Sequence, residues 1–468
     1  MEREKNLYMY VYRMILTCIY NGTYACHEKL PILPELCKQY NVGRNTVRSA
    51  LSELQKDGYV SLQKGVQASV LFDVEDLQGN IQYRQALIDG REMTKDVYET
   101  MDLIIPDLFM DCFHSKGMKL DEMKELVKEF TLDNIKNEAQ LIKRMYDIYL
   151  YIFHASDNPI LLDLFSTLLF YAYQPLIPER QSYTNLKRSV NGIRKATQIA
   201  LKFAQAKQDN IVKHMIRKMV NMHGVNSLRY IDELCHDLTP QQSVHFVWVC
   251  NRDQEYLYAK VALDILVSIA DKTYNLQDVL PSISALSKQY DVSDRTTRKA
   301  LEILRHYQVI ETVNGIGSRI IKTTFMSSDD ILKDEKVKAN LYACDDALQV
   351  FISICKAIMP SIIKDATKEE MIEIAKQMEG TSSKTLGSLS KYVFSKTNAC
   401  LNTIFYELYK TLDWVIFVNM FVENDEQNQL REDLIHALYE QQSRQIFQIA
   451  MNILEIDSLH ITTILQAI

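Results

Sequence analysis

Two short stretches of the chain combine cationic, amide and hydroxyl side chains at helical spacing. They run Arg44-Asn45-Thr46-Val47-Arg48 and Ser293-Asp294-Arg295-Thr296-Thr297-Arg298-Lys299. A guanidinium can donate two parallel hydrogen bonds to a guanine edge, an amide can pair with an adenine edge, and hydroxyl and cationic groups bind phosphate. These residue types therefore indicate recognition of a nucleic-acid duplex.

The remainder of the chain gives no motif that predicts catalysis. It contains no GxSxG, HExxH, Walker or dinucleotide-binding pattern. The 9 cysteines occur singly, without a CxxC pair, and most fall in apolar, helix-periodic text where cysteine behaves as a small hydrophobic residue. We therefore expect no enzymatic activity, no cofactor and no metal.

Length and composition favour a helical protein of several domains. The chain has 468 residues, 47% of them apolar, a net charge of −7 and only 13 glycines. That length is too great for one hydrophobic core, and the abundant Leu, Ile, Lys, Glu and Met favour helix. The start of the chain lacks a signal-peptide pattern, and the longest apolar stretch, residues 161–173, is too short to span a membrane. We expect a reduced, cytoplasmic protein without a membrane segment.

An internal repeat organises the sequence. Two segments align without gaps at a constant offset of 250: Leu7-Tyr8 recurs as Leu257-Tyr258, and Lys38-Gln39-Tyr40 recurs as Lys288-Gln289-Tyr290. Chance rarely produces so many matches in one register. The chain is therefore the product of a duplication.

Each copy has the pattern of a winged helix. In the first copy, an apolar stripe from Tyr8 to Ile19 predicts one helix, and a short helix follows Leu30-Pro31. The segment 41–43 breaks it, and a further helix begins whose inward residues are Val47, Ala50, Leu51 and Leu54. Alternating segments around Lys64-Gly65, and around Asn314-Gly315 in the second copy, predict a two-stranded wing.

Both copies resemble the DNA-binding domain of the GntR family of bacterial transcription regulators. The family pattern runs Leu-Pro, a short helix, Val-Ser-Arg-x-Thr-Val-Arg-x-Ala-Leu and a glycine-containing wing. Here it reads LPILPELCKQYNVGRNTVRSALSELQKDGYVSLQKG from Leu30 and LPSISALSKQYDVSDRTTRKALEILRHYQVIETVNGIG from Leu280. Pro34 and Ser284 replace a usual arginine, and Asp294 stands where the first copy keeps Arg44. We expect the copies to read different bases or to bind with unequal strength.

The resemblance and groove geometry together predict the DNA contacts. Arg44 is expected to contact a guanine and Asn45 an adenine, while Thr46 and Arg48 bind phosphate. The wing tips should approach the backbone or minor groove. The remaining predicted DNA-binding residues are Lys64 and Gly65 of the first wing, Ser293, Arg295, Thr296, Arg298 and Lys299 of the second helix, and Asn314, Gly315 and Arg319 of the second wing.

The text between and after the two copies is helix-periodic. The predicted helices are 91–114, 119–131, 134–155, 159–173, 185–206, 209–222, 345–359, 368–379, 398–421 and 426–454. One subgroup of the family, the FCD type, has an all-helical effector domain, and the helical segments of this chain resemble that domain. The stretch from Phe153 to Pro159 looks like one segment of the same domain. That likeness makes His154 and Asn158 candidate effector-binding residues. Leu150 stands where the subgroup's metal site has an aspartate, and His214 and His223 are unsuitably spaced, so no metal is predicted.

The sequence thus predicts a mainly α protein in which two winged helices alternate with two helical bundles. The expected domains are 1–74 and 251–325 for the winged helices, and 75–250 and 326–468 for effector binding or assembly. The expected partners are double-stranded DNA, a small-molecule effector and a second copy of the chain. A winged-helix scaffold for proteins is the main alternative, which the cationic recognition faces disfavour. The second copy could also have drifted into a structural role, because Asp294 would repel phosphate. The helical pattern of the sequence disfavours a winged helix fused to a pyridoxal-phosphate enzyme.

Overall fold

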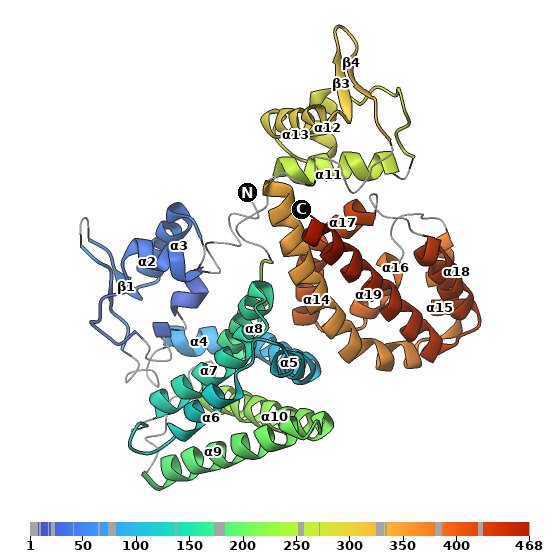
Figure 1. The fold of residues 1–468 in the computed structure, drawn as a ribbon. Coiled ribbons are helices and arrows are strands. Elements are labelled where there is room, and N and C mark those ends of the chain that lie inside the picture. Colours follow the sequence, from blue (N-terminus) through green and yellow to red (C-terminus); the bar gives the residue numbers. More distant parts are fainter. Residues whose placement is uncertain are drawn as a thin grey trace. The chain divides into compact units, whose positions relative to one another are not determined.

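The computed structural model divides into two compact units. Unit 1 comprises Met1–Val249 with Thr397–Ile404, and unit 2 comprises Cys250–Lys396 with Phe405–Ile468. The residues described are 8, 11–16, 18–19, 24–40, 42–63, 66–73, 81–135, 138–172, 183–250, 257–270, 272–323, 332, 335–379, 386–419 and 425–467. Figure 1 shows the elements of each unit in sequence colours.

Unit 1 begins with a winged helix, the first module. After a helical segment over 11–16, its elements are α2 (Leu33–Tyr40), α3 (Arg44–Lys56), β1 (Val60–Ser61) and β2 (Ser69–Val70). The two short strands are antiparallel, with Val60 opposite Val70. Gly58, just after α3, has a φ of 81°, a left-handed conformation that glycine adopts without the strain of a Cβ atom. This glycine turns the chain from α3 into the wing.

The core of the first module continues into the helical part of unit 1. Val11, Ile15 and Leu54 are fully buried in one apolar cluster. The same cluster includes Tyr83 from the first helix after the wing and Ile231 near the end of the last helix of unit 1. The first module and the helical bundle therefore share a continuous apolar contact within this unit.

Among its described residues, the helical part of unit 1 contains seven helices. They are α4 (Ile81–Asp89), α5 (Arg91–Phe113), α6 (Leu120–Lys128), α7 (Glu138–His154), α8 (Pro159–Ala172), α9 (Tyr183–Gln205) and α10 (Asp209–Leu234). Helices α5 and α10 form the most extensive helix pair. Gly224 of α10 lets the Tyr98 ring of α5 approach closely, because a Cβ there would lie 3.0 Å from that ring. The glycine thus helps to set the α5–α10 contact.

Unit 2 repeats this order of elements. The second module contains α11 (Leu257–Ala270), α12 (Ile283–Gln289), α13 (Asp294–His306), β3 (Ile310–Val313) and β4 (Gly317–Ile320). The helical part contains α14 (Glu335–Asp365), α15 (Lys368–Glu379), α16 (Gly387–Ser395), α17 (Ala399–Asn419), α18 (Asp425–Tyr439) and α19 (Ser443–Ala467). The residues of α17 before Phe405 are counted with unit 1. The most extensive helix pair of unit 2 is α14 with α19, which corresponds in order to α5 with α10.

Specific side-chain features recur in the two helical parts. The Asn158 side-chain oxygen accepts a hydrogen bond from the Leu161 amide at 2.9 Å at the start of α8, and Asn398 does the same for Leu401 at 3.0 Å at the start of α17. Each caps the first turn of its helix. Both α5 and α14 also contain an internal proline. The two helical parts therefore have these local features in common.

The predicted fold class is confirmed, since the chain is mainly helical with two small wings. Several predicted helix bounds are wrong. The helix predicted over 426–454 is two helices, α18 and α19, because Gln441 adopts a left-handed φ of 56° without a glycine or proline to signal it. Helix α10 continues beyond 222 to Leu234, α14 begins earlier and continues through Pro360, and α4 and α16 were not predicted.

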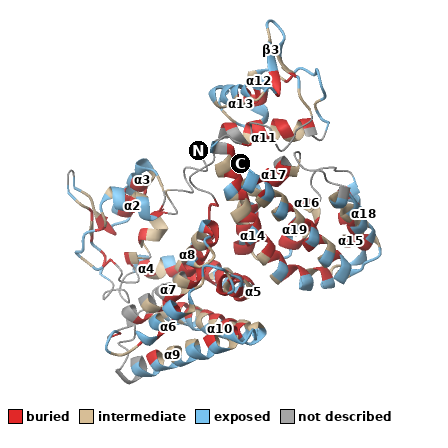
Figure 2. Ribbon diagram, in the orientation of Figure 1, coloured by how far each residue is buried: buried red, intermediate tan, exposed pale blue. Residues whose placement is uncertain are grey.

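Helix α14 is long and apolar enough to cross a membrane by length and composition. Within unit 2, however, 56% of its most apolar window is buried, and it pairs along its length with α19. In Figure 2, α14 is largely coloured as buried, whereas α15 and α18 show exposed faces. The arrangement is that of a core helix.

Candidate nucleic-acid interface and helical-domain cavity

Helix α3 of the first module separates an apolar inner face from a polar outer face. Val47, Ala50, Leu51 and Leu54 are buried, while Arg44, Asn45 and Arg48 are exposed and Thr46 is half-buried. Gly43 precedes the helix in an extended conformation and supplies no side-chain cap. The N-terminal turns of α3 therefore present two guanidinium groups and an amide to solvent.

Helix α13 of the second module repeats the pattern. Its exposed residues include Arg295, Arg298 and Lys299, and Thr296 is half-buried. Each residue from 292 to 300 has the same degree of burial as the residue 250 positions earlier, from 42 to 50. Asp294 is also exposed at the first position of the helix. The structure thus brings together the recognition-helix residues predicted from sequence in each module, with an acidic group added in the second.

The second module ties two of its predicted contact residues to each other. Ser293 caps α13, since its Oγ accepts a hydrogen bond from the Thr296 amide at 3.1 Å and lies 2.9 Å from the Thr296 hydroxyl. Below them, the Ser287 and Thr297 hydroxyls are hydrogen-bonded at 2.8 Å in the core. At an offset of 250, the first module has Cys37 and Val47 in place of this buried pair. The helix-turn-helix is therefore fastened by hydrogen bonds in one module and by apolar packing in the other.

The exposed arginines of the recognition helices are available to a ligand. Arg44, Arg48, Arg295 and Arg298 form no ion pair with any residue that the structure describes. Lys299, by contrast, lies 5.2 Å from the centroid of the Tyr258 ring, a distance at which a cation is attracted to the ring face. Their role as DNA contacts stays a prediction.

The second wing is a regular hairpin with an exposed tip. Its strands pair at four positions, from Ile310 with Ile320 to Val313 with Gly317. Asn314 and Gly315 are exposed at the tip, and Gly315 has a φ of 76° that favours glycine. Arg319 lies 3.8 Å from the Glu311 carboxylate on the neighbouring strand. In the first wing, Lys64 and Gly65 lie outside the described residues.

A small apolar cavity of about 50 Å³ lies inside the helical bundle of unit 1. Its wall comes from four helices: Tyr98, Met101, Ile105 and Phe109 of α5, Tyr149 and Phe153 of α7, Phe165, Leu169 and Ala172 of α8, and Ile216, Met219, Val220 and His223 of α10. The volume is sufficient for a few water molecules or a small organic group. The apolar wall makes it a site for uncharged groups.

The polar atoms of the wall are mostly occupied. The Tyr98 hydroxyl donates to the Ala172 carbonyl at 2.8 Å and is hydrogen-bonded to Ser227 at 3.0 Å. The Tyr149 hydroxyl lies 3.0 Å from the Met219 sulfur. His223 makes no hydrogen bond to a described residue, and burial lowers its pKa. A neutral imidazole is therefore the polar group that this wall offers to a ligand.

The two residues that sequence reasoning proposed for effector binding do not line this cavity. His154, at the end of α7, is exposed, and Asn158 is buried as the cap of α8. Their neighbour Phe153 does line it, stacked on Phe165 with ring centroids 3.6 Å apart. A role for His154 and Asn158 in effector binding stays a prediction.

The cavity residues were missed because their apolar periodicity does not distinguish a cavity wall from a filled core.

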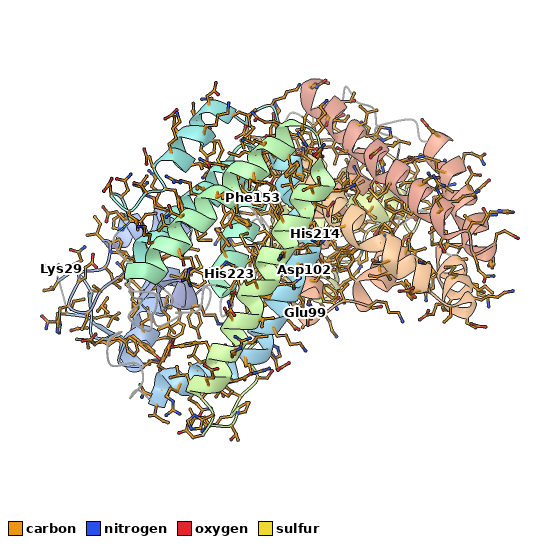
Figure 3. The ribbon with its side chains drawn as sticks, turned by 90° about the horizontal axis from the view of Figure 1, so that it is seen from below. Lys29, Glu99, Asp102, Phe153, His214 and His223 are labelled. Carbon is orange, nitrogen blue, oxygen red and sulfur yellow. The ribbon has the colours of Figure 1, made fainter. Side chains whose placement is uncertain are left out.

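His214 and His223 lie about two and a half turns apart on α10, where Figure 3 labels both. His214 is exposed and His223 reaches the cavity. Among the described residues, no group of three or more His, Cys, Asp and Glu side chains could hold a metal ion.

Comparison with known proteins identifies the two modules. A family model described as bacterial regulatory proteins, gntR family, matches residues 7–70 and 257–320. The uncharacterized HTH-type transcriptional regulator YurK of Bacillus subtilis is 42% identical over 59 residues, which are 13% of this chain and 24% of that protein. A probable fructoselysine utilization operon transcriptional repressor of Escherichia coli is 41% identical over 59 residues, with the same coverage of 13% and 24%. The chain thus matches about a quarter of the length of these two relatives.

Longer but weaker similarities extend into the helical part. The fatty acid metabolism regulator protein of Pasteurella multocida is 24% identical over 222 residues, 45% of this chain and 86% of that protein. Two solved structures are similar at low scores. E. coli McbR/YncC has a TM-score of 0.29 and 17% identity over 48% of this chain and 97% of that chain. Lar, described as controlling expression of the Listeria monocytogenes agr system, has a TM-score of 0.27 and 15% identity over 47% of this chain and 95% of that chain.

The similarity to this family is found in both modules independently. Each matched segment spans the helices and the wing of one module, and each exposes the polar recognition face that its sequence predicted. Residues 7–70 and 257–320, the two winged helices, are thus similar to the gntR family of bacterial regulatory proteins.

Proposed function

We propose that the protein is a cytoplasmic transcription regulator whose two winged helices bind one asymmetric DNA operator together. The observation that carries the proposal is the identical burial pattern of the two recognition helices, each of which exposes two arginines without an ion-pair partner among the described residues. A structural or scaffolding module would have no need of this unpaired cationic face. DNA supplies the anionic backbone and the base edges that such a face recognises.

The two modules are expected to read different half-sites. Arg44 begins the first recognition helix, whereas Asp294 begins the second. A guanidinium favours guanine edges, while a carboxylate can accept a hydrogen bond from cytosine but repels phosphate. Because one chain holds both modules, binding of the first raises the effective concentration of the second. The operator should therefore be asymmetric and the binding should be joint.

The experiment begins by footprinting the full-length protein on genomic DNA to obtain the operator. Arg44→Ala/Arg48→Ala and Arg295→Ala/Arg298→Ala are then compared with the unchanged protein. Each pair is expected to lower operator affinity at least about tenfold, because each removes base and phosphate contacts, and to shorten the footprint at one end. Lys124→Ala/Lys128→Ala on α6 removes the same charge from another exposed helix and should change neither. If the α13 pair leaves affinity and footprint unchanged, the second module does not read DNA.

We further propose that a small uncharged ligand, a metabolite or a lipid-like molecule, controls the first module through the cavity of unit 1. Helix α8 supports this link, because it contributes Phe165 and Leu169 to the cavity wall. Near its end, the Tyr171 hydroxyl accepts a hydrogen bond from Arg13 of the first module at 3.2 Å. A ligand that displaces α8 would therefore shift a contact of the DNA-binding module.

The ligand proposal is tested by thermal-shift measurements with benzene, indole and short alkanols as probes. At least one probe should raise the melting temperature, because filling apolar space restores lost contacts. Ala172→Leu, which fills the cavity from α8, should abolish the shift. Ala196→Leu on the exposed face of α9 makes the same chemical change outside the cavity and should preserve it. Absence of any stabilising probe would favour a bundle used for assembly alone.

The domain organisation proposed for this function has four parts. Residues 1–74 and 251–325 bind DNA, and residues 75–250 and 326–468 serve effector binding or assembly. The matched segments 7–70 and 257–320 support the two DNA-binding parts. Limited proteolysis should cleave first near 74, 250 and 325, and cleavage inside α5 or α14 would contradict this division.

A further inference from the structure

Two helices at the same place in the order of the two units carry opposite charge. Helix α9 immediately precedes α10, and α18 immediately precedes α19. Helix α9 contains five basic residues and no acidic residue. Helix α18 contains four acidic residues and a single arginine, and Glu440 follows it directly. A common origin does not require this reversal of charge.

The charges also repeat with the same spacing. Every one of the five acidic residues lies 238 positions after one of the five basic residues. The basic residues are Lys187, Arg188, Arg194, Lys195 and Lys202, and the acidic residues are Asp425, Glu426, Glu432, Asp433 and Glu440. A spacing of seven aligns side chains along one helix face, with a rise of about 10.5 Å between successive charges. We call these two sets the basic row and the acidic row.

Both rows face outward in their own units. In the basic row, Arg194 is half-buried and the other four residues are exposed. None of the five forms an ion pair with a residue that the structure describes. The inner face of α9 is apolar, with Val190, Leu201 and Ala204 buried. The basic row is therefore a solvated surface without an acidic partner among the described residues of its unit.

The acidic row has a similar setting. Glu426, Glu432, Asp433 and Glu440 are exposed, and the side chain of Asp425 lies outside the described residues. The one arginine of α18, Arg431, points inward and donates a hydrogen bond to the Met378 carbonyl of α15. The exposed face of α18 is consequently acidic along its length.

We propose that two copies of this chain associate by pairing the basic row of α9 in one copy with the acidic row of α18 in the other. Each copy carries both rows, so either row of one copy has an oppositely charged row in the other copy. Matched charge rows speed the encounter and fix the register of the helices. Single exposed ion pairs contribute little and are screened by salt, so the association depends on the whole row and weakens as ionic strength rises.

The acidic row favours a second copy over DNA as the partner of α9. A basic helix alone would also suit a phosphate backbone. DNA binding by α9 would leave the acidic row without a purpose, and that row would repel the duplex. Pairing between copies accounts for both rows and for their common spacing.

The test measures self-association of the full-length protein by sedimentation velocity, without DNA, at low and high salt. We expect dimers at low salt that dissociate at high salt. Lys195→Glu/Lys202→Glu and Asp433→Lys/Glu440→Lys should each raise the dimer dissociation constant at least about tenfold, because like charges then face each other. The protein with all four changes should return to within about threefold of the original value, because the pairs are restored with reversed sign.

Lys124→Glu/Lys128→Glu on α6 is the matched control and should leave dimerisation unchanged, with circular dichroism to verify folding of every variant. The proposal is overturned if the unchanged protein stays monomeric at low salt, or if the four-fold variant fails to regain dimers. It is also overturned if reversal of α9 lowers DNA affinity while self-association is unchanged, which would make α9 a DNA contact. Because no DNA is present in the association assay, its outcome is independent of the proposed regulatory function.

Discussion

The α5–α10 pair of unit 1 and the α14–α19 pair of unit 2 are built alike but have different interiors. Beside α10, the bundle encloses a small apolar cavity whose wall includes His223. Within α19, Asp457 is buried, and its carboxylate accepts hydrogen bonds from Asn419 at 2.9 Å and Gln427 at 2.7 Å. The two units thus share the helix pairing and differ in the buried polar group. Ligand chemistry inferred for one unit cannot be transferred to the other.

The aromatic residues differ in the same way. In unit 1, the stacked rings of Phe153 and Phe165 form part of the cavity wall. In unit 2, Phe394 and Phe405 stack with centroids 4.0 Å apart, and Phe351 packs against both. Phe165 also packs edge-on against Tyr149, so each cluster has three rings, and the three rings of unit 1 line a cavity.

The largest expected effect comes from truncating these rings. Phe405→Ala should destabilise unit 2 by about 3–5 kcal/mol, because it removes a ring that is 2% exposed and packed on two others. Phe165→Ala should cost less, about 2–3 kcal/mol, because one side of that ring already faces the cavity. Urea unfolding followed by circular dichroism measures both. Equal losses would mean that the two interiors are equally filled.

The buried titratable groups should give the two units opposite responses to pH. Burial raises the pKa of Asp457 to about 6 from its ordinary 3.8. The folded state then holds this proton more tightly than the unfolded state, so stability falls as pH rises from about 4 to 6, by at most about 3 kcal/mol. Asp457→Asn should be more stable than the unchanged protein at pH 7.5 and equally stable near pH 4.

For unit 1 the sign is reversed, because burial lowers the pKa of His223. The folded state favours the neutral imidazole, so His223 lowers the stability of the protein as the pH falls below 6.5, the ordinary pKa of histidine. The His223→Gln protein should not show this loss of stability at low pH, as measured by urea unfolding. In unit 2, His460 is hydrogen-bonded to Asn419 at 3.0 Å, close to Asp457, and burial lowers its pKa as well. To separate the two groups, the effect of Asp457→Asn on stability is measured in the unchanged protein and in the His460→Gln protein.

The DNA-binding surfaces should respond in opposite directions to loss of their first residue. Arg44→Ala is expected to weaken operator binding by about 1–3 kcal/mol, the range for a bidentate base contact. Asp294→Ala should strengthen it by about 0.5 kcal/mol, because an exposed carboxylate near phosphate is removed. Fluorescence anisotropy on the operator and on unrelated DNA separates base from phosphate contacts. Equal losses on both DNAs for Arg44→Ala would make Arg44 a phosphate contact.

The smallest expected effects concern the start of each recognition helix. Ser293→Ala should cost about 1 kcal/mol, because the Thr296 amide loses its side-chain acceptor. Gly43→Ser should gain a few tenths of a kcal/mol, since Gly43 has a φ of −70° and open space where a Cβ atom would lie. Thermal unfolding of each variant measures the difference. A loss on Gly43→Ser would show that glycine is needed there for another reason.

The sequence predicted the modules better than the bundles. Apolar periodicity and the repeat located both recognition helices and the residues they expose, because those helices are amphipathic and locally determined. The two wings were predicted around positions that lie between β1 and β2 and between β3 and β4. The break at Gln441 and the continuation of α14 through Pro360 were missed, because tertiary packing there overrides the local signals.

The site beyond the DNA-binding surface could not be predicted from one sequence. Tyr98, Phe165 and Met219 are apolar residues at helical spacing, and the space between them depends on how four helices pack. Asn158 was selected from a short resemblance, whereas its side chain caps a helix, as does that of Asn398. A cap and a ligand contact draw on the same residue types, and only the structure distinguishes them.

Trp248 gives unit 1 an optical reporter. The chain has 2 tryptophans, and the division into units assigns Trp248 to unit 1 and Trp414 to unit 2. The Trp248 indole is 1% exposed and donates a hydrogen bond to the Asp163 carboxylate of α8 at 2.7 Å. Indole emission is sensitive to the electric field of a neighbouring charge. In a Trp414→Phe protein, the wavelength of the Trp248 emission maximum would therefore report movements of α8 without any attached label.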